Sequence, residues 1–202
     1  TAKQLHESRC QAAGKLAQQV THSIKGLAME NAEFFIEVNL DLTKVASNGA
    51  DNIVFTLRSN LGQQAQPLAK VASGGELSRI MLAIKTVLAD SDDIPTLIFD
   101  EIDTGISGRT AQRVAEKLAV IARNHQVICI THLPQIASMA DCHFEIKKST
   151  DGASTKTRIT RLKEDEVVAE LARLLGGAQI TDAVLQNARE MKELAWQTKT
   201  HN

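Results

Sequence analysis

Hydrophobic and polar residues follow one spacing before residue 30 and another after it. From about Thr1 to Leu27, apolar residues recur every three, four or seven positions and form one stripe on an otherwise polar segment. This spacing predicts a single amphipathic helix. Two interpretations stay open, a helix lying on the protein surface or the end of a coiled coil entering a globular domain. We therefore separate residues 1–30 from a domain at residues 31–202.

The pattern after Asn31 changes to the alternation of β-strands. Residues 34–42 alternate between apolar and polar side chains, and a turn cluster at residues 47–52 separates them from a second run at residues 53–58. Such runs around a turn predict an antiparallel hairpin, with residues 60–67 as a loop.

The middle of the chain alternates between predicted helices and strands. Apolar residues have helical spacing in 76–88 and 109–123, whereas the short apolar runs 96–99 and 126–130 have the length of buried strands. A strand, a helix and a strand in succession predict a βαβ unit whose two strands are parallel. The predicted fold class is therefore α/β, with parallel core strands flanked by helices.

The last third of the chain predicts a hairpin and two helices. The strands are expected at residues 142–147 and 155–162 around a turn at 149–152, and the helices at 164–175 and 181–197. Gly176 and Gly177 are expected to end the first helix, and Thr181 or Asp182 to cap the second.

Composition excludes several classes of function. The 202 residues carry a net charge of −1 and only 3% aromatic side chains, with no Tyr, which argues against base-stacking platforms and against strong attraction of the whole chain to nucleic acid. The three cysteines form no CxxC pair and no disulfide framework, so a reducing compartment is expected. No metal-ligand spacing and no apolar run of about 20 residues is present, so we expect no membrane partner.

The segment Ser73-Gly74-Gly75-Glu76 opens the helix predicted at residue 76. One interpretation is an ordinary capping box, with Ser73 as N-cap and Glu76 reaching back. Two glycines in a first helical turn, however, each cost roughly 1 kcal/mol relative to Ala. Bare N–H groups at a helix start favour an anion, so the alternative interpretation is a phosphate site.

Charged residues follow the carboxyl ends of the two predicted parallel strands. Asp100 and Glu101 come directly after the first strand, and His132 follows the second. Because ligands bind at that edge of a parallel sheet, we expect the three side chains to converge. Asp100 could hold a hydrated Mg²⁺, and Glu101 could deprotonate a water that attacks a phosphate. Taken singly, the two acids are equally compatible with a solvated strand end, and His132 is equally compatible with a structural histidine.

These motifs, in this order and spacing, resemble the heads of ABC/SMC-type ATPases, and in particular the RecN-like DNA repair proteins. Residues 71–79 are similar to the ABC signature, residues 97–101 to the Walker B strand, residues 103–107 to the D-loop, and Thr131-His132 to the switch histidine. The resemblance covers nearly the whole chain. It implies the C-terminal lobe of a P-loop NTPase-like head, with the first helix as the end of a coiled coil.

The resemblance also implies partners and site residues. By this resemblance, two heads form a homodimer and hold ATP between them. The protein would bind DNA ends during the repair of double-strand breaks by recombination. It would do so in the bacterial cytoplasm, at the nucleoid. Residues acting on the nucleotide of the partner head are Ser73, Gly74, Gly75 and Glu76. Residues acting in their own head are Asp100, as the Mg²⁺ ligand, with Glu101 and His132 as catalytic residues. Residues at the contact between heads are Asp103, Thr104 and Gly105.

One motif of the family is not found in this sequence. No G-x-x-x-x-G-K-[ST] occurs, and the only Gly-Lys pair, Gly14-Lys15, lies inside the first helical pattern. ATP and Mg²⁺ are therefore expected to need the Walker A lobe of the full-length protein, and the chain alone is expected to be inactive. Two alternatives are the nucleotide-binding domain of an ABC transporter and a non-catalytic DNA-tethering module. The 72 residues before Ser73 argue against the first, and the Asp100-Glu101 pair argues against the second.

A basic stretch surrounds the second predicted hairpin. It is either a local DNA contact or an ordinary solvated pair of strands, and its residues are Lys147, Lys148, Lys156, Arg158, Arg161 and Lys163.

Overall fold

The computed structural model describes residues 1–71, 73–91, 93–151, 154–177 and 179–201. Two predicted features extend beyond these ranges, because Ala72 of the signature-like segment and Gly152 of the predicted turn lie outside them. The chain divides into two units, Thr1–Ile130 and Thr131–Asn202. Among the described helices, none combines the length and the apolar character needed to cross a membrane.

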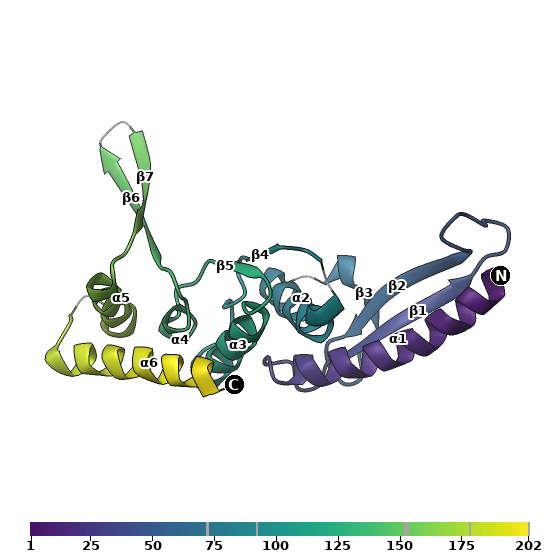
Figure 1. Cartoon of the computed structure of the whole chain (residues 1–202), viewed down its shortest axis with the longest axis horizontal. Coiled ribbons are helices and arrows are strands. Elements are labelled where there is room, and N and C mark those ends of the chain that lie inside the picture. The colour runs from purple at the N-terminus through teal and green to yellow at the C-terminus, as the bar shows by residue number, and fades with distance from the viewer. Residues whose placement is uncertain (72, 92, 152–153, 178, 202) are drawn as a thin grey trace. The chain divides into compact units, whose positions relative to one another are not determined.

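The first unit begins with a helix packed along a β-meander (Figure 1). Its elements are α1 (Ala2–Lys25), β1 (Glu33–Leu40), β2 (Asp51–Arg58), β3 (Gln66–Pro67) and the short 3₁₀ turn η1 (Leu68–Lys70). β1 and β2 pair antiparallel from Glu33↔Arg58 to Leu40↔Asp51, so the predicted hairpin is confirmed. Burial alternates along β1 as the sequence pattern predicts.

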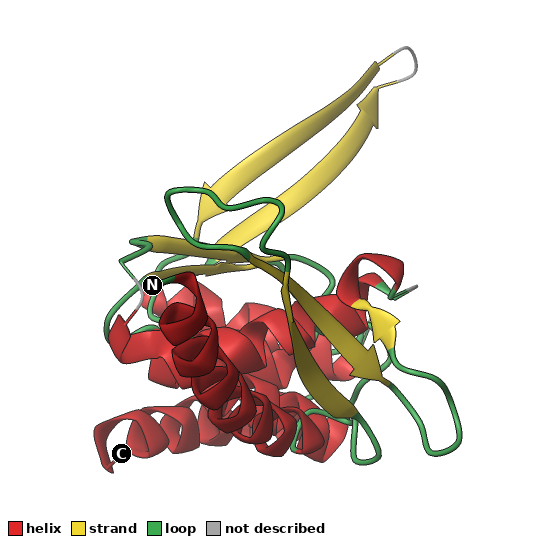
Figure 2. Ribbon diagram, turned by 90° about the vertical axis from the view of Figure 1, so that its right-hand side faces the viewer, coloured by secondary structure: helices red, strands yellow, loops and turns green. Residues whose placement is uncertain are grey.

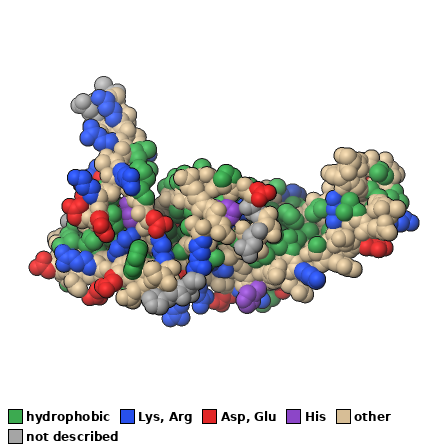
Figure 3. All heavy atoms as spheres, viewed as in Figure 1, with side chains coloured by type: hydrophobic (Ala, Val, Ile, Leu, Met, Phe, Trp, Pro, Cys, Tyr) green, Lys and Arg blue, Asp and Glu red, His purple; other side chains and the backbone are tan. Residues whose placement is uncertain are grey.

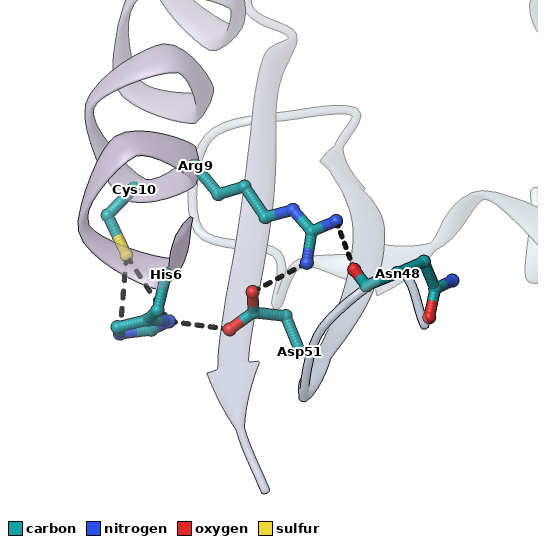
Figure 4. Close-up of polar contacts among 5 residues, drawn as sticks. All are labelled: His6, Arg9, Cys10, Asn48 and Asp51. Atoms are coloured by element: carbon teal, nitrogen blue, oxygen red, sulfur yellow. Dashed lines mark hydrogen bonds and ion pairs between the residues drawn. The ribbon is translucent and has the colours of Figure 1, made fainter. Parts of the chain in front are cut away.

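The apolar stripe of α1 is buried only toward its C-terminal end. Val20 and Ile24 are fully buried, whereas Leu5 is 38% exposed. The N-terminal half is held by polar contacts instead (Figure 4). His6 Nδ1 and Arg9 Nη1 each lie 2.7 Å from the carboxylate of Asp51, whose side chain is inaccessible to solvent. The bond from Arg9, aided by His6, lowers the pKa of Asp51.

The second half of this unit contains the predicted βαβ succession. Its elements are α2 (Gly74–Leu88), the 3₁₀ turn η2 (Ala89–Ser91), β4 (Thr96–Phe99), α3 (Gly108–Ile121) and β5 (Gln126–Cys129). β4 and β5 are parallel, with register Thr96↔Gln126 to Phe99↔Cys129, which confirms the predicted strand direction. Fully buried apolar residues on the two helices, including Leu82 and Val114, form the core beside these strands.

The prediction that β4 and β5 are buried on both faces is wrong for this unit. Leu97 and Phe99 are buried, but Ile98 is 67% exposed and Ile128 is 46% exposed. An uninterrupted apolar run cannot reveal this difference, because successive side chains of a strand point to opposite faces. One face of the pair packs into the core, and the other is open.

The described residues of the second unit form three packed helices and a hairpin. Its elements are α4 (Pro134–Ser138), β6 (Phe144–Asp151), β7 (Ser154–Arg161), α5 (Glu164–Gly176) and α6 (Asp182–His201). Val167, Leu171, Ala172 and Ala188 form its core. The Lys192 ammonium donates to the Ala140 carbonyl at 2.8 Å, which fixes the end of α4 on α6.

The hairpin of the second unit is longer than predicted (Figure 2). β6 and β7 pair as far as Asp151↔Ser154, so the strands continue through residues 149–151, where the sequence predicts a turn. Ser and Thr are common in turns, but here they lie on paired strands. The helix α4 was also not predicted, since its five residues are too few for a helical period to be recognised.

Candidate functional site

The predicted acidic pair lies where the chain leaves β4. Asp100 and Glu101 are both exposed, and an Asp100 carboxylate oxygen accepts the Glu101 N–H at 2.9 Å. Glu101 has φ of +57°, a left-handed conformation that costs roughly 1–2 kcal/mol for a residue with a side chain. Such conformations cluster at functional sites, where surrounding contacts hold them in place.

Contacts with the start of α2 hold this turn. Ser73 is the N-cap of α2, and its hydroxyl accepts the Glu76 N–H at 3.4 Å, which confirms the Ser73 half of the predicted capping box. The Ser78 hydroxyl donates to the Asp100 carbonyl at 2.8 Å. The helix start is therefore tied to the end of the strand.

The two glycines of α2 face this turn at close range. A Cβ on Gly74 would collide with the Glu101 carboxylate, and a Cβ on Gly75 would lie 3.0 Å from both the Glu101 carbonyl oxygen and Thr104 Cβ. The bare backbone thus has a role within the chain, because it lets Glu101 and Thr104 approach the helix. A carboxylate at a helix start is also favoured by the helix dipole.

Arg79 joins α2 to the loop after Glu101. It is 5% exposed, and its Nη1 donates to the carbonyl oxygens of Ile102 at 3.2 Å and Thr104 at 2.9 Å. Burial lowers the pKa of Arg79, and the nearby charge of Glu76 partly offsets this effect. The sequence placed Arg79 in the signature-like segment but gave no reason to expect a buried guanidinium that holds the loop.

The loop predicted to contact a second head is only partly on the surface. Thr104 and Gly105 are exposed, and Gly105 has φ of +74°, whereas Asp103 is buried with 4% exposure. The Thr104 N–H donates to the Glu101 carbonyl at 3.0 Å, so the acidic pair and the loop form one continuous turn.

Cys129, at the end of β5, lies near the acids that follow β4. Burial raises its pKa to about 12, and the negative charges of Asp103 and Asp100 act in the same direction. The parallel pairing therefore brings the end of β5 to the edge of the sheet where the acids lie. Cys129 is a free cysteine of intermediate burial.

His132 belongs to the second unit, in the segment between β5 and α4. Next to it, the Leu133 N–H donates to the Thr131 hydroxyl at 3.0 Å. The parallel direction of β4 and β5 satisfies one condition for His132 to approach Asp100 and Glu101. Their convergence stays a prediction.

No preformed metal centre is found among the described residues, since no three His, Cys, Asp or Glu side chains are grouped to hold an ion. The Asp100 carboxylate is exposed where the chain leaves β4, so it could hold Mg²⁺ together with phosphate oxygens and water.

Comparison with curated proteins finds close relatives among DNA repair proteins. The chain is 58% identical over 194 residues to the DNA repair protein RecN of Haemophilus influenzae, covering 96% of the chain and 35% of the relative. It is 45% identical over 190 residues to RecN of Vibrio cholerae, covering 94% of the chain and 34% of the relative. The chain thus spans about a third of the length of these relatives. No protein-family model matches it.

Solved structures with a similar fold include SMC heads. The Smc head domain of Pyrococcus yayanosii, with its coiled coil and joint, superposes with a TM-score of 0.56 at 20% identity, covering 81% of this chain and 29% of that one. The Smc head of Pyrococcus furiosus, bound to the C-terminal domain of ScpA, gives 0.52 at 19% identity, covering 82% and 39%. The predicted ABC/SMC head fold is therefore confirmed, as is the resemblance to RecN-like proteins.

Proposed function

Because this chain belongs by its sequence to the RecN family of DNA repair proteins, we propose that it supplies the signature and Walker B half of an ATP-hydrolysing head. The observation that carries the proposal is the contact between Glu101 and the glycine-opened start of α2. It brings an acid, held in a left-handed conformation at a strand end, to the glycine-opened start of a helix. In a homodimer of heads the two groups would face different ATP molecules: Glu101 the one in its own head, and the helix start the one held by the second head.

Each residue has a distinct role in this proposal. Glu101 accepts a proton from the water that attacks the γ-phosphate of ATP, and His132 acts with it in the same head. Asp100 would hold Mg²⁺, which when bound neutralises charge on the phosphate oxygens. The signature residues bind the γ-phosphate of ATP held by the second head, and they are Ser73, Gly74, Gly75 and Glu76. The loop that meets the second head contains Asp103, Thr104 and Gly105.

The complete protein adds the parts that this sequence lacks. A Walker A lobe of the same full-length protein would hold the triphosphate, and α1, within residues 1–30, would continue into a coiled coil. Two such heads form a homodimer around ATP in a bacterial cytoplasmic protein at the nucleoid. There it acts on DNA double-strand ends during recombinational repair. The names of the relatives support this proposal over an ABC transporter domain.

Reconstitution with the Walker A lobe tests the proposal. Glu101→Gln should lower ATP hydrolysis at least about 100-fold, the usual contribution of a positioned general base, while dimers formed with ATP accumulate. Glu7→Gln on the exposed side of α1 is the matched control and should leave hydrolysis unchanged. The chain without the Walker A lobe should show no turnover.

Two outcomes count against the proposal. Wild-type hydrolysis by the Glu101→Gln protein would remove Glu101 from the chemistry. Failure of the reconstituted wild-type pair to hydrolyse ATP would favour the non-catalytic tethering module instead.

A further inference from the structure

The hairpin β6–β7 carries a positive charge that the rest of the chain does not share. Residues 143–163 contain six Lys or Arg and two Asp or Glu, whereas the whole chain has a net charge of −1. Figure 3 shows Lys and Arg side chains gathered along this hairpin. The charge is therefore local, on one element of the second unit.

The hairpin is exposed to solvent along its length. Every residue of β7 is exposed, and on β6 Phe144 is 60% and Ile146 is 52% exposed. A two-stranded hairpin that packs on no core is marginally stable in water, and it offers its surface for binding. At its base the Leu162 N–H donates to the His143 carbonyl at 2.9 Å, which joins the two strands where they leave the rest of the unit.

The register of the hairpin places like charges side by side. Lys147 lies directly opposite Arg158, and Lys156 lies opposite Ser149 on the same face, which we call the basic face. Directly opposed like charges destabilise a strand pair. The Lys147 ammonium is 2.8 Å from the Glu145 carboxylate, but within the described part of the chain no ion pair involves Lys156 or Arg158. A bound polyanion would relieve this repulsion.

We propose that the basic face binds the sugar-phosphate backbone of duplex DNA, and this rests on the proposed role of the family in DNA repair. Lys, Arg, Ser and Thr are the side chains that contact phosphates, and a two-stranded ribbon fits the major groove. Eight residues per strand give the ribbon a length of about 26 Å. The basic face has no aromatic residue to stack on bases, so binding is independent of sequence.

Duplex binding by the 202-residue chain tests this proposal directly. The test variant carries Lys147→Gln, Lys156→Gln and Arg158→Gln. The matched control removes three exposed charges from the first unit, through Lys3→Gln, Lys15→Gln and Arg123→Gln. Fluorescence anisotropy of a labelled 30-base-pair blunt duplex is followed from 25 to 300 mM salt. Circular dichroism checks that both variants fold.

The salt dependence gives the expected magnitude. Each lost phosphate contact lowers the slope of log Kd against log salt by about 0.9, so the basic-face variant should lose about 2.7 in slope. Its affinity at low salt should fall at least about 10-fold, and the control should keep the wild-type slope.

Several outcomes would overturn the proposal. The first is a slope of log Kd against log salt that stays unchanged in the basic-face variant. The second is a loss of slope in the control equal to that in the basic-face variant. The third is the absence of duplex binding by the wild-type chain at low salt. Tighter binding to phosphatidylglycerol vesicles than to duplex would assign the basic face to a membrane surface instead. The assay contains no ATP, so its failure leaves the proposed ATPase role of Glu101 untouched.

Discussion

Replacing Gly75 by alanine should destabilise the first unit, although alanine favours a helix. The gain in helix propensity is about 1 kcal/mol. The added Cβ would meet the Glu101 carbonyl oxygen and Thr104 Cβ at 3.0 Å and the Thr104 carbonyl oxygen at 3.1 Å. Both oxygens are held, because the first accepts the Thr104 N–H at 3.0 Å and the second accepts Arg79 Nη1 at 2.9 Å.

Because these neighbours cannot move without loosening their hydrogen bonds, the overpacking cost should lie at the upper end of the usual range of about 1–3 kcal/mol. The net loss is then about 1–2 kcal/mol. For a chain of this size, such a loss lowers Tm by about 2–8 °C. Differential scanning calorimetry of the 202-residue chain measures this shift.

Gly14→Ala provides the matched control for the same chemical change. Gly14 lies inside α1, and a Cβ there would meet nothing within 4 Å. The control should therefore gain about 0.5–1 kcal/mol of stability and raise Tm. If Gly75→Ala also raises Tm, the close approach of α2 to the turn after β4 is not rigid, and the structural reason given for the glycine is wrong.

Two further predictions concern titrating side chains. Because burial raises the pKa of Cys129 to about 12, its thiol should resist iodoacetamide at pH 8, whereas the exposed Cys10 and Cys142 should react. Peptide mass spectrometry measures the rate of labelling at each cysteine. Equally fast labelling of all three would contradict the burial of Cys129. Burial lowers the pKa of His143 below 6.5, so near that pH the folded chain binds fewer protons than the unfolded chain. The stability of the folded chain should therefore fall as the pH drops through 6.5 toward the pKa of His143 in the folded state. His143→Gln should flatten that dependence in thermal melts between pH 5 and 7.5, and an unchanged dependence would show that other groups cause it.

Local patterns in the sequence determined most of the secondary structure. The alternation of Phe34, Ile36 and Val38 predicted β1, and helical spacing after Glu76 predicted α2. The strand–helix–strand succession predicted that β4 and β5 are parallel, because a crossover of that length returns the chain in the same direction. These features depend on residues close together in the chain, so the sequence reports them directly.

The components of the candidate site were also visible in the sequence, but their contacts were not. The motif order picked out Ser73 to Glu76 and the acids Asp100 and Glu101. The sequence interpretation explained the glycines by an external phosphate, whereas the tertiary structure adds Glu101 and Thr104 as neighbours inside the chain. These contacts join residues 26 to 29 positions apart, and no local period encodes them.

The sequence by itself thus determined most of the elements, their order, the parallel pair and the identity of the chemical groups. Only the tertiary structure decided that Arg79 is buried beneath the loop after Glu101, that Ile98 and Ile128 are exposed, and that Lys147 lies opposite Arg158. The physical reason is that burial and cross-strand pairing depend on which surfaces meet in space. A period along the chain specifies which face of an element a residue occupies, but not what covers that face.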